Sequence, residues 1–191
     1  MTRNVRIPPP GVGPDERSPR MYQPELAGEI DDFYQAAARL SALDPVVTEL
    51  VRLRCARHHD CRICKAVRQR DARESGVDAE MTAKIDFFEQ SDLEERLKVA
   101  LRYTDAFITQ PAGAGPRLAA DLLAHFSPAE VVELSLDIMK WSTQKIHVTL
   151  GLDLMAGVNV DSGAVILFDL DASGRPVNFA SAEDEAVTAR S

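Results

Sequence analysis

Helix start and stop signals recur along the chain and decide most of what it can fold into. Asp44 stands before Pro45, which is the arrangement of an N-cap followed by proline in the first turn. Capping-box spacings occur at residues 91–94 and 127–130, and Gly151 marks a helix stop. Together with the spacing of apolar residues, these signals predict helices over about residues 24–40, 44–59, 61–75, 78–88, 91–109, 117–125 and 127–150.

One segment near the carboxyl end has the pattern of a strand. Residues 165–168 are β-branched, apolar or aromatic, and a turn is expected at 172–176. Because helices dominate, we predict an all-α bundle with a short irregular or β-like C-terminal segment. Five prolines in residues 1–20 predict an extended arm. We therefore expect this arm, a helical domain over 21–158 and a C-terminal extension over 159–191.

The charge and hydropathy of the chain argue against two classes of partner. Its 191 residues carry a formal net charge of -8, which repels the phosphates of nucleic acids. No apolar run reaches the roughly 18 residues that a membrane span requires, and the amino end lacks the apolar core of a secretory signal. We therefore expect a cytoplasmic protein that binds neither nucleic acid nor membrane. In a reducing cytosol, a close cysteine pair is more often catalytic or metal-binding than structural.

Three cysteines, Cys55, Cys61 and Cys64, lie within ten residues of one another. We expect Asp60 to cap a helix whose first turn holds Cys61, with Cys64 on the same face. Free N–H groups at a helix start stabilise a thiolate, so the pKa of a cysteine there should fall. Two sulfurs this close could also form a disulfide. Further positive charge near them would come from Arg62, Lys65 and Arg68.

Two other interpretations of these cysteines stay open at this stage. Cysteine is among the most frequently buried residue types, so the pair could be inert core residues. A zinc site could also be built from the three cysteines with His58 or His59. Zinc sites usually draw their ligands from separate elements, whereas these would all come from one short segment.

The region around the cysteines resembles the alkylhydroperoxidase D-like (AhpD-like), or carboxymuconolactone decarboxylase, family. Glu49 stands twelve positions before Cys61, which is the spacing that family has between a helical glutamate and its CxxC pair. The segments that also resemble core helices of the family are residues 66–76, 100–106 and 126–134. The resemblance covers roughly residues 25 to 155, so the arm and the C-terminal extension fall outside it.

The resemblance implies a role for each matching residue. Cys64 would attack a hydroperoxide, Cys61 would resolve it as a disulfide, and Glu49 would act as general base or proton relay. The family histidine four positions after the second cysteine is Arg68 here, and an arginine cannot shuttle protons. The nearest substitutes are His58 and its neighbour His59; His147, on the last long helix, is more distant in sequence.

These roles describe a thiol-dependent peroxidase or disulfide oxidoreductase. It would reduce a hydroperoxide or another small-molecule substrate, need no bound cofactor, and be recycled by a protein or small-molecule thiol reductant. The alternatives are a decarboxylase-like lyase on the same scaffold, which would not need two cysteines, and a redox sensor without turnover. The resemblance also implies a homo-oligomer, either a trimer or a hexamer.

Overall fold

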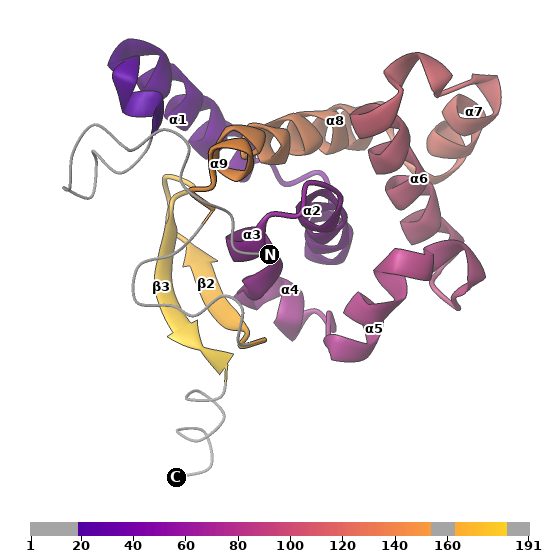
Figure 1. The fold of residues 1–191 in the computed structure, drawn as a ribbon. Coiled ribbons are helices and arrows are strands. Elements are labelled where there is room, and N and C mark those ends of the chain that lie inside the picture. Colours follow the sequence, from indigo (N-terminus) through magenta and orange to yellow (C-terminus); the bar gives the residue numbers. More distant parts are fainter. Residues whose placement is uncertain (1–18, 154–162, 183–191) are drawn as a thin grey trace, which may run out of the picture.

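The computed structural model describes residues 19–153 and 163–182, which are mostly helical with a small sheet at one side (Figure 1). None of the helices in these two stretches has the length and hydropathy of a membrane span. In chain order the elements are η1 (Pro19–Tyr22), α1 (Pro24–Ala38), α2 (Pro45–His58), α3 (Arg62–Ala66), β1 (Val67–Gln69), α4 (Arg70–Glu74), α5 (Ala79–Ala83), η2 (Lys84–Gln90), α6 (Glu95–Thr109), η3 (Pro111–Gly113), α7 (Pro116–His125), α8 (Pro128–Ser142), α9 (Lys145–Leu150), β2 (Ile166–Leu170) and β3 (Pro176–Ser181).

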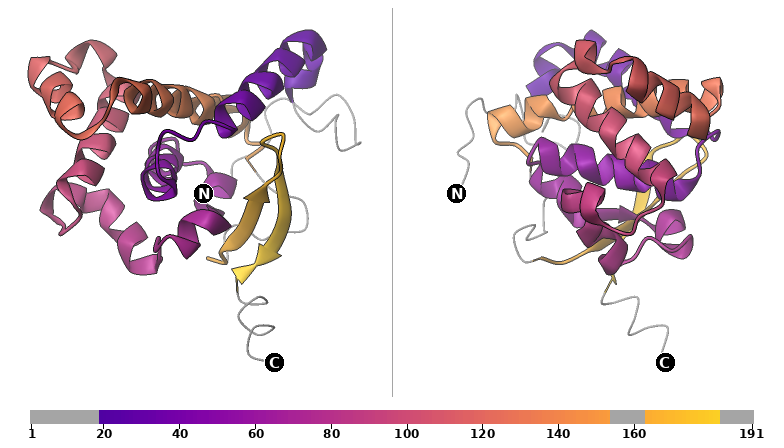
Figure 2. Two further views of the ribbon diagram at one scale, coloured as in Figure 1. Left: turned by 180° about the vertical axis from the view of Figure 1, so that it is seen from behind. Right: turned by 90° about the vertical axis from the view of Figure 1, so that its right-hand side faces the viewer.

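Helix α2 is the centre of the bundle. Figure 1 shows it end-on, with α8, α6, α5 and α4 around it, and the turned views in Figure 2 keep it enclosed. A helix covered on several sides has to be apolar on several sides, and α2 buries Val47, Leu50, Val51 and Leu53 almost completely. The CxxC segment follows directly after α2, so the core helix determines where the cysteines lie.

Most of the predicted helix signals are confirmed. The side chain of Asp44 accepts a hydrogen bond from the backbone N–H of Val47 at 2.9 Å. At the start of α8, Ser127 and Glu130 form the predicted capping box. Gly151 follows α9 with φ 75°, the left-handed conformation that glycine adopts without steric cost. These caps and this helix stop depend only on residues close to them in the sequence, which is why the sequence spacing predicts them.

Two predicted helix boundaries are wrong. Ser91 does not cap α6, which begins at Glu95 after an uncapped Glu94; the hydroxyl of Ser91 instead bonds within the preceding turn, donating to the carbonyl oxygen of Phe88 at 2.7 Å. The long last helix is also interrupted, because α8 ends at Ser142 and α9 begins at Lys145.

The helix predicted over residues 61–75 is broken by a strand. Asp60 does not cap it: its φ is 54°, and the N-cap of α3 is Cys61. After α3 the chain becomes β1, which pairs in parallel with β2 so that Val67 lies opposite Ile166. The carbonyl oxygens left without helical partners accept hydrogen bonds from arginines. Arg52 donates to the carbonyls of Cys64 and Val67 at 2.8 and 2.6 Å, and Arg68 to those of Lys65 and Val67 at 2.6 and 2.8 Å.

The sheet has the order β1-β2-β3, with β2 and β3 forming an antiparallel hairpin. The strand predicted at 165–168 is confirmed as β2, whereas β1 and β3 were not expected. Residues 1–18, which make up nearly all of the predicted arm, lie outside the described residues, as do 154–162 and 183–191.

Candidate functional site

Cys61 and Cys64 form a disulfide at the amino end of α3, with their Cα atoms 5.3 Å apart. The sulfur of Cys61 accepts from the backbone N–H of Cys64 at 3.3 Å. Cys61 is buried, whereas Cys64 is partly exposed. The predicted pairing of the two sulfurs is therefore present, and Cys64 is the more accessible of the two.

A buried carboxylate fixes the helix that carries the disulfide. Asp153, which follows α9, accepts from the backbone N–H of Arg62 at 2.9 Å and pairs with its guanidinium group at 2.9 Å. Its own carbonyl oxygen accepts from the N–H of Ile63 at 3.3 Å. Burial alone would raise the pKa of Asp153, but the hydrogen bonds from Arg62 hold it below its usual value. Asp153 thus joins the segment after α9 to the first turn of α3, a role that no signal in the sequence predicted.

Glu49 lies in the core and is paired with Arg52. Each oxygen of its carboxylate accepts from the guanidinium group at 2.7 Å, and Glu49 has no solvent-exposed surface. The same guanidinium group binds the carbonyl of Cys64. Glu49 is therefore linked to the disulfide segment through Arg52, and both of its oxygens are engaged.

The disulfide opens on a cavity of about 900 Å³. Its walls come from the CxxC segment, α1, the junction of α8 and α9, and the β2–β3 hairpin. Volumes of this size are typical of sites for organic molecules. The larger apolar side chains among the lining residues are Ile63, Val67, Trp141, Phe168, Leu170, Pro176 and Phe179, and the polar ones are Arg20, Asp31, Asp32, Tyr34, Gln35, Arg52, His59, Gln69, Lys140, Gln144 and Arg175.

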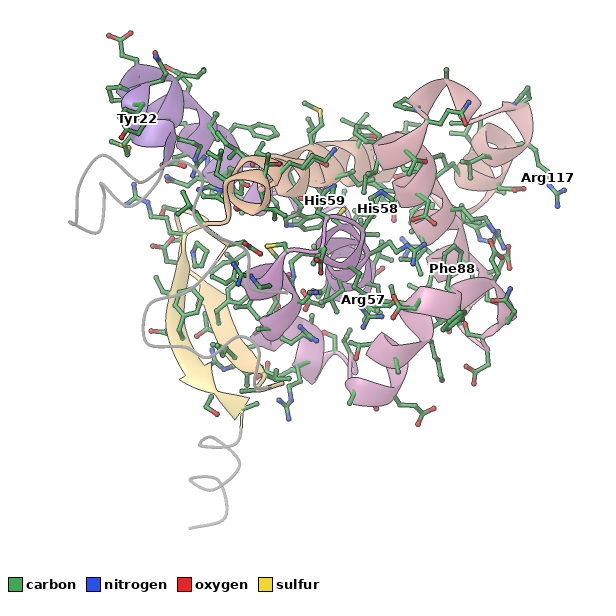
Figure 3. All side chains as sticks on the ribbon, in the orientation of Figure 1. Tyr22, Arg57, His58, His59, Phe88 and Arg117 are labelled. Atoms are coloured by element: carbon green, nitrogen blue, oxygen red, sulfur yellow. A yellow bond between two sulfur atoms is a disulfide. The ribbon has the colours of Figure 1, made fainter. Side chains whose placement is uncertain are left out.

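Of the two adjacent histidines at the end of α2, the structure places His59 at the cavity and His58 at the surface. His58 is exposed and does not line the cavity, whereas His59 does. Figure 3 labels the two residues next to each other at the end of α2. The Nε2 atom of His59 is buried without a hydrogen-bond partner. Burial, with the positive charge of Lys145 nearby, lowers the pKa of His59 to about 4, so its imidazole is neutral near pH 7. His147 is not among the residues that line the cavity.

Arg68 lies outside the large cavity and closes the carboxyl end of α3. It lines a smaller hollow of about 210 Å³ together with Arg62 and Lys65. Burial and the neighbouring charge of Arg52 lower the pKa of Arg68 to about 10. Its hydrogen bonds to two carbonyl oxygens give it a backbone-holding role that a histidine ring could not fill in the same way.

A polar cluster on the cavity wall was not foreseen from the sequence. The hydroxyl of Tyr34 on α1 bonds to the hydroxyl of Thr143 and accepts from Gln144 at 2.9 Å. Burial raises the pKa of Tyr34. Tyr34 and Gln144 both line the cavity, and they meet where α8 gives way to α9. The interruption of the long helix thus supplies Gln144 to the cavity wall and Thr143 as a hydrogen-bond partner of Tyr34.

The third cysteine takes no part in this arrangement. Cys55 is buried within α2, and burial raises the pKa of its thiol to about 12. Among the described residues, no group of three or more histidine, cysteine, aspartate or glutamate side chains is placed to hold a metal ion.

Comparison with solved structures identifies the architecture. Debrominase Bmp8 without ligand superposes with a TM-score of 0.60 over 75% of this chain and 77% of its own, at 16% identity. A protein of unknown function from Agrobacterium tumefaciens, proposed to be the antioxidant defence protein AhpD, gives 0.58 over 82% of this chain and 100% of its own, at 21% identity. The fold is AhpD-like. The predicted fold class is thereby confirmed, and at these identities the likeness concerns the fold alone.

The chain also has uncharacterised sequence relatives. Uncharacterised proteins Rv2313c and MT2376, from two strains of Mycobacterium tuberculosis, are each 43% identical to it over 128 residues. The match covers 66% of this chain and 45% of each relative, so the chain corresponds to less than half of their length. No family model matches the sequence.

Proposed function

We propose that this protein is a dithiol oxidoreductase that reduces organic hydroperoxides at Cys64. The observation that carries the proposal is a disulfide at a helix start, lying on the wall of a cavity of about 900 Å³. A dithiol in that position can pass two electrons to a bound molecule and end as the disulfide seen here. The AhpD-like fold supports the same conclusion by analogy.

Within the protein, the bonds that change in the proposed reaction are those of the two thiols. In the reduced protein the thiolate of Cys64 attacks the distal peroxide oxygen, the O–O bond breaks, and the alkoxide leaves to take up a proton as an alcohol. The thiol of Cys61 then displaces water from the resulting sulfenic acid and closes the disulfide. A protein or small-molecule dithiol returns two electrons and two protons, and becomes a disulfide itself.

The roles of the surrounding polar groups follow from their geometry. The unpartnered Nε2 atom of His59 would bond to an oxygen of the substrate in the cavity, taking the place of the family histidine. Glu49 would act as a positioning residue, because Arg52 engages both of its oxygens and holds the carbonyl of Cys64. A general-base role for Glu49 requires that ion pair to open.

The test is oxidation of the reduced protein by one equivalent of cumene hydroperoxide, followed by peptide mass spectrometry. We expect a rapid Cys61–Cys64 disulfide and matched loss of peroxide, both abolished in Cys64→Ser. Cys61→Ser should still consume one equivalent and stop at the sulfenic acid, and Cys55→Ala should behave as the wild type. Thiols that stay reduced for hours would overturn the proposal and favour the lyase alternative. One oxidation per chain without turnover, whichever dithiol is supplied, would favour a redox sensor.

Reductive dehalogenation is a second candidate, favoured by the aromatic side chains on the cavity wall. A cysteine-to-alanine variant of debrominase Bmp8, which shares the fold, has been crystallised with 2,3,4-tribromopyrrole and superposes with a TM-score of 0.59 at 15% identity. Replacing a ring bromine by hydrogen would oxidise the two thiols to the Cys61–Cys64 disulfide and release bromide and one proton. Bromide release from 2,3,4-tribromopyrrole, with no reaction toward cumene hydroperoxide, would select this activity over the first.

We also propose that the protein is a homo-oligomer. Three large apolar residues at seven-residue intervals, Val132, Met139 and Ile146, are exposed along α8 and α9. Val132 and Met139 share one face of α8, and exposed apolar residues gathered on one helix face are typical of a surface that packs against a partner. Light scattering should give a mass of three or six chains at micromolar concentration, and a monomer would contradict the proposal.

A further inference from the structure

The β2–β3 hairpin forms one wall of the cavity, and its position depends on contacts at both of its ends. At one end β2 pairs with β1, the strand that directly follows the CxxC helix, so that Gln69 lies opposite Phe168. At the other end the turn rests on α1, where the guanidinium group of Arg39 donates to the carbonyl oxygen of Ser173 at 2.7 Å. Figures 1 and 2 show the hairpin extending from the α3 region to α1.

The turn of the hairpin is held by internal hydrogen bonds and fits closely against α1. The carboxylate of Asp171 accepts from the N–H of Ser173 at 2.8 Å and from that of Arg175 at 3.0 Å. Gly174 has φ 85°, and a Cβ atom placed there would lie 2.6 Å from the carbonyl oxygen of Gln35. That oxygen belongs to the backbone of α1, so it cannot yield as a flexible side chain would. Only glycine allows the turn to lie this close to α1.

The cavity side of the hairpin is aromatic. The rings of Phe168 and Phe179 stack with their centroids 5.8 Å apart, and both side chains line the cavity. Phe168 is buried, but Phe179 is 45% exposed. An exposed aromatic ring on a cavity wall provides apolar surface that a bound molecule can cover. Trp141, on α8, lines the same cavity.

We propose that the β2–β3 hairpin determines substrate choice, by requiring an organic molecule with a bulky apolar or aromatic body that packs against Phe179. The proposal rests on the proposed function only in that Cys64 is taken as the reacting group. The hairpin supplies the apolar contact. The close fit of Gly174 against α1 fixes the distance between the hairpin and the opposite wall of the cavity. A molecule without an apolar body, such as hydrogen peroxide, gains nothing from this wall.

Binding can be measured without catalysis, because Trp141 is the single tryptophan of the chain and lines the cavity. The probe is 2-phenyl-2-propanol, the alcohol formed from cumene hydroperoxide, titrated against tryptophan fluorescence. We expect a saturable change in the wild type and between about twofold and about tenfold weaker binding in Phe179→Ala, which is the fold-change that an aromatic contact of about 0.5–1.5 kcal/mol corresponds to. Leu123→Ala is the matched control, because Leu123 is 66% exposed on α7 and does not line the cavity.

A second pair of variants tests the seating of the turn. Gly174→Ala should weaken binding of the alcohol, because the Cβ atom pushes the turn away from α1. Gly76→Ala introduces alanine at φ 103° with no atom within 4 Å of the new Cβ, so it carries similar backbone strain without the clash and should bind as the wild type does.

The outcomes separate the two proposals. The proposal that the hairpin selects the substrate is supported if Phe179→Ala and Gly174→Ala bind the alcohol more weakly while Leu123→Ala and Gly76→Ala bind it as the wild type does. Equal affinities in Phe179→Ala and Leu123→Ala, or a wild type without saturable binding, would overturn it. Alcohol binding that depends on Phe179, in a protein whose thiols resist every hydroperoxide, would keep the selector and remove the peroxidase. If Gly174→Ala fails to fold, Phe179→Ala decides alone.

Discussion

Glu49 and Arg52 form a buried, two-pronged ion pair one turn apart on α2, with both N–O distances at 2.7 Å. The remaining donors of Arg52 reach the carbonyl oxygens of Cys64 and Val67. The pair therefore connects the core helix to the two short elements that carry the disulfide and begin the sheet. The two charges face each other, Arg52 also binds backbone carbonyl oxygens, and the charge of Arg68 lies close enough to act on both members of the pair.

Removing one member of this pair should be costly. We expect Arg52→Gln to lower the free energy of unfolding by about 3–5 kcal/mol, because it leaves a buried carboxylate uncompensated. Urea unfolding monitored by circular dichroism measures this loss. Arg102→Gln is the control: Arg102 pairs with Glu89 and Glu95, which are both exposed, so it should cost about 1 kcal/mol or less. Equal losses in the two variants would contradict the prediction.

The three thiols should differ sharply in reactivity. In reduced, native protein we expect Cys61 and Cys64 to react with Ellman's reagent, because both line the cavity. Cys55 should react only in denaturant, since it is buried and the pKa of its thiol is raised to about 12. The release of thionitrobenzoate should therefore occur in two separated phases. If all three thiols of the native protein react with the reagent at one rate, α2 opens more readily than this packing implies.

His59 should make stability depend on pH below neutrality. Its pKa in the folded protein is lowered to about 4, whereas an unfolded histidine titrates near 6.5. Between these values the unfolded chain binds more protons, so this contribution to stability is present above about pH 6.5 and is lost as the pH falls toward 4. The urea midpoint should drop between pH 7.5 and 5.5, and drop less in His59→Gln. The exposed neighbour gives the control, since His58→Gln should follow the wild type.

Asp153 should tune the thiols through Arg62. Its buried carboxylate neutralises the guanidinium group beside the first turn of α3. In the reduced protein, Asp153→Asn leaves that positive charge to stabilise a thiolate, so we expect the pKa of Cys64 to fall by on the order of 1 unit. Iodoacetamide alkylation against pH reports it. Asp60→Asn breaks the exposed pair with Lys65 and should shift the alkylation profile less; a shift of equal size would argue against this mechanism.

The sequence predicted those parts of the fold that depend on near neighbours. The caps at Asp44 and Ser127 and the stop at Gly151 each need only a few adjacent residues, and the structure confirms them. The break after Ala66 could not be foreseen in that way, because it depends on β2, a strand from the far end of the chain. Sequence spacing carries no signal for such a partner.

The same distinction between near and distant neighbours in the sequence applies to the candidate site. The pairing of Cys61 with Cys64 follows from their spacing on one helix turn. That His59 lines the cavity while His58 is exposed depends on how the last turn of α2 is oriented, which two adjacent histidines do not reveal. The engagement of Glu49 by Arg52 needed the packed core to be seen, and the assigned roles of these residues stay predictions.

The parallel pairing of β1 with β2 has a consequence for the order in which the protein matures. Val67 leaves the ribosome long before Ile166, its partner in the sheet, and contacts so distant in sequence form late in folding. The nascent chain therefore displays its cysteine pair before the wall that encloses it exists. Until β2 and β3 have been synthesised, that pair lacks the wall that we propose selects its substrate.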